Sequence, residues 1–100
     1  MKNGFKLLWT ETALADLQNI INYLTENWTT REIQNFAKKL DRRVNLIGLN
    51  PKLFAKTSKR KNVRRSVLTK HTVIYYASNE ATVTILSLFD SRQNPKKLKF

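Results

Sequence analysis

The sequence predicts a two-layer α+β fold of the order β-α-α-β-β-β, with a helical hairpin packed on a small, mostly antiparallel sheet. Three observations predict this fold. A short apolar segment, FKLLW, comes first, and two stretches with apolar residues every three or four positions follow it. From residue 62 onward, apolar and polar residues alternate instead. One hundred residues with 41% apolar content suffice for one core, so we expect a single domain over residues 1–100.

The first two elements are a strand and a helix. Residues 5–9 are short, apolar and bounded by polar sequence, so we expect a strand buried on both faces or nearly so. Thr10 fits the N-cap of a helix that should end near Asn27, with Trp9 and Trp28 packing at its two ends. The apolar stripe of this helix is Ala13, Leu14, Leu17, Ile20, Ile21 and Leu24.

A second helix follows directly. Thr29 and Glu32 have the spacing of a capping box, and Asn50-Pro51 ends the helix because a residue before proline is disfavoured in helical geometry. The connection at Trp28 is so short that the helices should lie antiparallel. The apolar face of the second helix is Ile33, Phe36, Ala37, Leu40, Val44 and Ile47.

Beyond a basic loop at residues 52–61, the segments NVRRSVL, HTVIYYAS and TVTILSLF read as strands. The breaks between them are short enough for hairpins, so these strands should form an antiparallel meander that the strand at residues 5–9 joins. Tyr75 and Tyr76 should point to opposite faces. We expect one of them in the core, with the other covering the sheet or stacking on a base.

The charge is strongly positive and unevenly distributed. Nineteen Lys and Arg face seven Asp and Glu, for a net charge of +12. No acid lies between Asp41 and Glu80, although that stretch carries the bases Arg42, Arg43, Lys52, Lys56, Lys59, Arg60, Lys61, Arg64, Arg65 and Lys70. Solubility alone does not require such segregation, so we expect an anionic partner, either a nucleic acid or an acidic protein.

The amino-acid composition excludes several kinds of metal, catalytic and phosphate-binding site. The absence of Cys excludes disulfides and thiolate metal sites, and His71 is the only histidine. Gly4 and Gly48 cannot make a glycine-rich phosphate loop. We therefore expect no metal and no cofactor. Without a signal peptide or an apolar run of the roughly 20 residues that a membrane helix needs, the chain is expected to be cytoplasmic and away from membranes.

The candidate site residues are basic. Arg64 and Arg65 are adjacent on a strand, so only one of them can face the open surface, and the sequence does not show which. Arg92 follows the last strand, where LFDSR should present it beside the Arg64/Arg65 strand, and the lysines after Pro95 form a basic tail. The alternative is a solvated face on which Arg92 pairs with Asp90 in a weak surface ion pair.

The chain resembles a known family over nearly its whole length. The matching features are the pattern A-x-x-D-L-x-x-I-x-x-Y-L at residues 13–24, the second helix ending in Asn50-Pro51, the arginine-bearing strand, the VIYY strand and the final ILSLFDSRQNP. Together, in this order, they resemble the RelE/ParE superfamily of toxins from bacterial type II toxin–antitoxin systems. The first-helix pattern is closer to ParE-like members.

The resemblance implies a toxin that a cognate acidic antitoxin neutralises by covering its basic surface in a hetero-oligomer. ParE-like members poison DNA gyrase and are not nucleases, whereas RelE-like members are ribosome-dependent mRNA endonucleases. The residues expected to bind the target or a nucleic acid are Lys56, Lys59, Arg60, Lys61, Arg64, Arg65, Lys70 and Arg92.

A nuclease would use Arg64 or Arg65 and Arg92 on the phosphate, with His71 as a further candidate. The nucleases carry an arginine where this chain has Thr72, and a tyrosine after the position of Arg92 that this chain lacks. The gyrase-type toxin is therefore the favoured hypothesis and the mRNA endonuclease the alternative. A third possibility is a non-enzymatic nucleic-acid-binding module.

Overall fold

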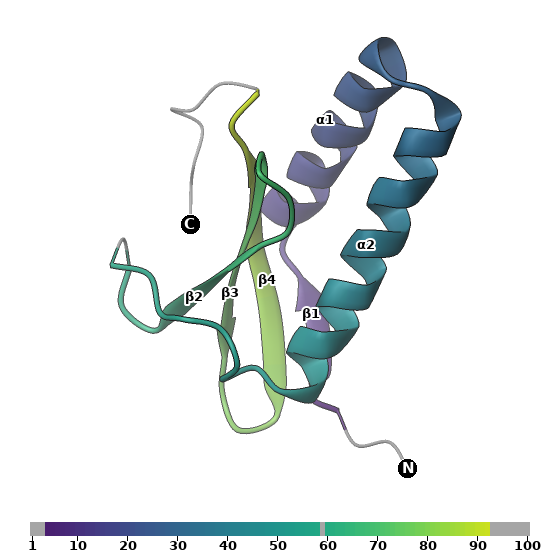
Figure 1. Cartoon of the computed structure of the whole chain (residues 1–100). Coiled ribbons are helices and arrows are strands. Elements are labelled where there is room, and N and C mark those ends of the chain that lie inside the picture. The colour runs from purple at the N-terminus through teal and green to yellow at the C-terminus, as the bar shows by residue number, and fades with distance from the viewer. Residues whose placement is uncertain (1–3, 59, 93–100) are drawn as a thin grey trace.

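The computed structural model describes residues 4–58 and 60–92 (Figure 1). Its elements follow the predicted order: β1 (Lys6–Trp9), α1 (Glu11–Asn27), α2 (Thr30–Leu49), β2 (Val63–Val67), β3 (Thr72–Ser78) and β4 (Thr82–Asp90). The strands form one sheet in the order β1-β4-β3-β2, and the helical hairpin covers one of its faces. The predicted α+β architecture is confirmed. Lys59 and the predicted basic tail after Pro95 lie outside the described residues.

Both helices begin where their capping residues predict. The hydroxyl of Thr10 accepts a hydrogen bond from the amide of Ala13 at 3.0 Å. The Thr29 hydroxyl accepts from the amide of Glu32 at 3.3 Å, while the Glu32 carboxylate accepts from the Thr29 amide, which completes the capping box. Asn50 ends α2 directly before Pro51, as expected.

The sheet is mixed. The pairs β2–β3 and β3–β4 are antiparallel, as the meander requires, whereas β1 runs parallel to β4. The register between β3 and β4 shifts after Tyr75, so that Leu86 bulges out of the ladder. The expectation that both faces of the first strand are buried was wrong. Lys6 and Leu8 are exposed because β1 is an edge strand with only one face covered.

The core fills the space between the helices and the inner face of the sheet. Its buried residues are Ala13, Ile20, Leu24, Phe36, Leu40, Val44, Ile47, Leu68, Ile74, Tyr76, Val83, Ile85 and Leu88. Trp9 packs against this cluster, as predicted, but Trp28 is 44% exposed because it lies in the connection between the helices. Leu14, assigned to the inner stripe of α1, is also exposed. Tyr75 and Tyr76 are both buried.

Candidate functional site

The predicted site residues fall into two groups at different places on the sheet. Arg64 pairs with Tyr76, whereas Asp90, which precedes the Arg92 turn, pairs with Thr72. These positions are four residues apart on β3, or about 14 Å along the strand, and β3 lies between β2 and β4. The structure therefore does not place Arg92 beside the arginines of β2, contrary to the expectation from the sequence.

The two adjacent arginines of β2 have different environments. Arg64 is half-buried on the face that packs against the helices, where its guanidinium donates to the carbonyl of Phe54 at 2.7 Å. Arg65 points to the opposite face and is exposed. This answers the question that the sequence left open, because Arg65 is the one on the open surface.

Further contacts hold the start of the basic loop against the sheet. The hydroxyl of Tyr76 donates to the carbonyl of Pro51 at 2.6 Å. Burial raises the pKa of this hydroxyl, although the positive charge of Arg64 opposes the shift. The guanidinium of Arg43 lies 5.3 Å from the ring centroid of Phe54, in the geometry of a cation–π contact. Arg43 thus belongs to this group, and only its place in the acid-free stretch distinguished it in the sequence.

The loop then continues as a short extension of the sheet edge. Lys56 forms an isolated bridge with Arg64, and the amide of Thr57 donates to the carbonyl of Val63 at 2.8 Å. Lys56, Arg60 and Lys61 are exposed. Of the predicted binding residues in this loop, Lys56 therefore lies on backbone that is paired to β2, and Arg60 and Lys61 lie in the turn that follows it.

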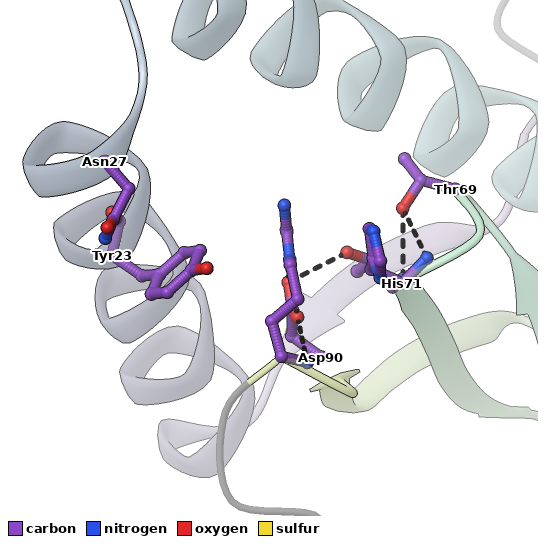
Figure 2. A network of polar contacts seen from close by, with 7 residues as sticks. Tyr23, Asn27, Thr69, His71 and Asp90 are labelled. Carbon is purple, nitrogen blue, oxygen red and sulfur yellow. Dashed lines mark hydrogen bonds and ion pairs between the residues drawn. The ribbon is translucent and has the colours of Figure 1, made fainter.

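Arg92 forms an ion pair with Asp90. Figure 2 shows Asp90 in a network of polar contacts between Tyr23 and His71. Nε of Arg92 donates to Oδ1 of Asp90 at 3.0 Å, and a terminal guanidinium nitrogen donates to Oδ2 at 2.6 Å. Thr72 donates to the same carboxylate at 3.2 Å, and the guanidinium lies 5.1 Å from the ring centroid of Tyr23. The Asp90 side chain is only 1% exposed and that of Arg92 is 17% exposed. The pairing of Arg92 with Asp90 that the alternative expected is therefore present, but it is bidentate and its carboxylate is buried, so it is not a weak surface ion pair.

The pair shifts the ionisation of both partners. Burial of Asp90 disfavours its charged form, but the hydrogen bonds and charge of Arg92 together with the Thr72 hydroxyl outweigh burial and lower the pKa of Asp90. The hydrogen bond to Asp90 raises the pKa of Arg92. The charge on Arg92 is therefore largely balanced within the protein.

A cavity of about 330 Å³ lies between the free end of the helical hairpin and the β2–β3 connection. Lys70, His71 and Arg92 line it, so these three predicted residues do come together. Sequence reasoning missed the residues that α1, α2 and their connection contribute, because periodicity marks them only as core or solvent positions. They are Leu24, Trp28, Glu32, Asn35, Phe36 and Lys39.

Asp16 has a structural role that the sequence did not reveal. Its Oδ2 accepts hydrogen bonds from the hydroxyl of Ser87 at 2.8 Å and from the amide of Leu88 at 3.1 Å. β1 pairs with β4 only as far as Ile85, so this amide lies beyond the parallel ladder. Asp16 therefore provides a hydrogen-bond acceptor for a backbone amide at the edge of β4, at a position beyond the end of β1.

Within residues 4–58 and 60–92, no group of three His, Asp or Glu side chains could hold a metal ion. In the same part of the chain, no helix combines the length and apolarity required to cross a bilayer.

Comparison with known proteins identifies the family. The family model described as "ParE toxin of type II toxin-antitoxin system, parDE" matches residues 7–95. A comparison with curated protein sequences finds no match.

Solved structures share the fold at low sequence identity. The chromosomal ParDE system from P. aeruginosa superposes with a TM-score of 0.73 at 18% identity, covering 89% of this chain and 98% of that one. The toxin–antitoxin complex DinJ–YafQ from E. coli gives 0.64 at 8% identity, with 89% and 94% covered. The family model covers most of the sequence, and the chain belongs to the ParE toxin family of type II toxin–antitoxin systems.

Proposed function

We propose that this toxin arrests growth by binding an essential DNA-handling machine of the DNA gyrase type, without cutting RNA, and that an acidic antitoxin neutralises it in the cytoplasm. Membership of the ParE family supports the toxin role. The solved ParDE and DinJ–YafQ relatives are toxin–antitoxin systems, which supports an antitoxin partner.

The observation that carries the non-nuclease part of the proposal is the pairing of Arg92 with Asp90. A nuclease would need this guanidinium to stabilise negative charge on the scissile phosphate. Here the Asp90 carboxylate accepts hydrogen bonds from two nitrogens of the Arg92 guanidinium and supplies a negative charge that balances it. Thr72, where the resembling nucleases have an arginine, is buried and donates to the same carboxylate.

The surface that would meet the target is the exposed part of the basic loop together with Arg65. Lys56, Arg60, Lys61 and Arg65 are all exposed. Lys56 and Arg65 lie on backbone that is paired between the loop and β2, while Arg60 and Lys61 lie in the turn that joins these two paired segments. Such a surface can contact DNA phosphates in a gyrase–DNA complex, or the carboxylates of an antitoxin.

Induction of the chain in cells, followed by primer extension on mRNA, tests the proposed mechanism. The proposal expects growth arrest and induction of the DNA-damage response, with no new 5′ ends on translated mRNA. Codon-phased new 5′ ends that disappear in Arg92→Ala, with the variant still folded, would establish the mRNA endonuclease instead. Unaffected growth with soluble protein present would favour a plain nucleic-acid-binding module.

The antitoxin part is tested by co-expression with an acidic protein encoded beside the toxin. Co-expression should restore growth, and hydrogen exchange of residues 52–65 should slow in the complex. Slowed exchange elsewhere, with residues 52–65 unchanged, would show that the antitoxin contacts a different surface.

A further inference from the structure

The cavity at the free end of the helical hairpin combines an apolar floor with a charged rim. Leu24 and Phe36 form buried parts of its lining and are 5% and 8% exposed. Trp28 adds an indole that is 44% exposed. An exposed tryptophan next to buried apolar side chains is typical of the residues that anchor protein–protein contacts. At about 330 Å³, the cavity is at the lower end of the range of ligand sites, about 300–1,000 Å³.

The rim carries two exposed lysines on opposite walls. Lys39 belongs to α2, and Lys70 lies in the connection between β2 and β3. Arg92 also lines the cavity, but Asp90 already balances its charge. Glu32 on the same rim offsets part of the positive charge. The remaining charge therefore suits a single carboxylate better than a phosphate with two negative charges, which Glu32 would repel.

We propose that this cavity binds an acidic peptide segment of the antitoxin. The segment places one aromatic or branched apolar side chain against Trp28, Leu24 and Phe36, and one carboxylate between Lys39 and Lys70. This inference rests on the proposed function for the identity of the partner. The apolar and acidic groups expected in the bound segment follow only from the residues that line the cavity. The site is separate from the basic loop, since Arg64 at the base of that loop and Asp90 beside the cavity lie at different registers of the sheet.

Titration of the ¹⁵N-labelled full chain with the peptide acetyl-EDFLED-amide tests the inference by NMR. The expected shifts are largest for the Trp28 indole and the Lys70 and His71 amides, with smaller changes in residues 56–58. The neutral peptide acetyl-QNFLQN-amide and the charged peptide acetyl-EDSSED-amide should each bind at least about tenfold more weakly, since each lacks one of the two recognised groups.

A pair of matched double variants shows whether the peptide binds at the cavity. Lys39→Glu/Lys70→Glu should weaken binding of acetyl-EDFLED-amide by about tenfold or more, while Lys56→Glu/Lys61→Glu, with the same change in net charge, should weaken it less than about threefold. A dispersed amide spectrum confirms that each variant is folded.

Three results would overturn the inference. The first is no shift at Trp28 with peptide up to about 5 mM. The second is equal loss of binding in the two double variants. The third is tighter binding of AMP than of the peptide at the same residues, which would make the cavity a nucleotide site. Growth arrest upon induction is measured separately. Growth arrest without peptide binding at the cavity would overturn this inference alone, whereas absence of growth arrest would contradict the proposed function.

Discussion

Removal of the Arg92 side chain should destabilise the protein far more than loss of an ordinary surface arginine. In Arg92→Ala the Asp90 carboxylate, 1% exposed, loses both guanidinium donors. Among residues 4–58 and 60–92, it keeps the Thr72 hydroxyl and the amide of residue 92 as donors. Breaking a buried ion pair from one side costs about 3–5 kcal/mol. Because two donors remain and Arg92 itself is partly exposed, we expect a loss of about 3 kcal/mol in the free energy of unfolding at pH 7.

The pH dependence of this loss has a defined sign. The pKa of Asp90 is lowered in the folded wild type, whereas an unfolded Asp titrates near about 3.9. The contribution of the pair is therefore fully present above about pH 4 and is lost as the pH falls through the folded pKa of Asp90. The difference in stability between wild type and Arg92→Ala should shrink as the pH falls from 4 toward that pKa.

Urea unfolding followed by circular dichroism at pH 7 and at about pH 3 measures both effects. Arg60→Ala is the matched control, since it removes the same side chain from an exposed loop position and should change stability by less than about 0.5 kcal/mol. A loss below about 1 kcal/mol for Arg92→Ala at pH 7, or a loss that stays the same at pH 3, would refute the reasoning.

Four further variants test the structural roles of Asp16, Arg64, Arg65 and Thr29. Asp16→Ala should cost about 2 kcal/mol in urea unfolding, because it leaves donors at the edge of β4 without their acceptor; a loss no greater than that of Glu26→Ala would contradict this. Arg64→Ala should cost about 1–3 kcal/mol, whereas Arg65→Ala should leave stability within about 0.5 kcal/mol and weaken binding of the target; the reverse order would invalidate the assigned faces. Thr29→Ala should lower the free energy of unfolding in urea by about 1 kcal/mol, and no change would show that the capping box does not stabilise the protein.

Sequence patterns predicted the fold well where the cause is local. Thr10, Thr29 and Asn50 mark helix ends because capping depends on neighbouring residues, and the structure confirms all three. The prediction that both faces of the first strand are buried was wrong. The place of this strand at the sheet edge depends on strand order, which no local sequence pattern contains. The exposure of Leu14 and Trp28 has the same origin, since it depends on which surfaces the helices leave uncovered.

The candidate site was only partly predictable for a similar reason. Sequence spacing showed that Arg64 and Arg65 point in opposite directions, but only the position of the carbonyl of Phe54 shows that Arg64 is the internal one. The cavity joins Trp28, Lys39 and Lys70 from three separate elements. Their convergence requires the tertiary structure. The sequence marked Lys70 as a basic candidate and Trp28 as a packing residue, but nothing in it placed either of them beside Lys39.

Supercoiling of a relaxed plasmid by purified DNA gyrase, measured with increasing amounts of the purified toxin, tests the central proposal most directly. The proposal predicts that the toxin inhibits supercoiling, or traps cleaved plasmid, in a dose-dependent way. Charge reversal at Arg65 and Lys56 should weaken this effect, whereas Arg65→Lys should retain it. Undiminished supercoiling in the presence of folded toxin that arrests growth in cells would contradict a gyrase-type target.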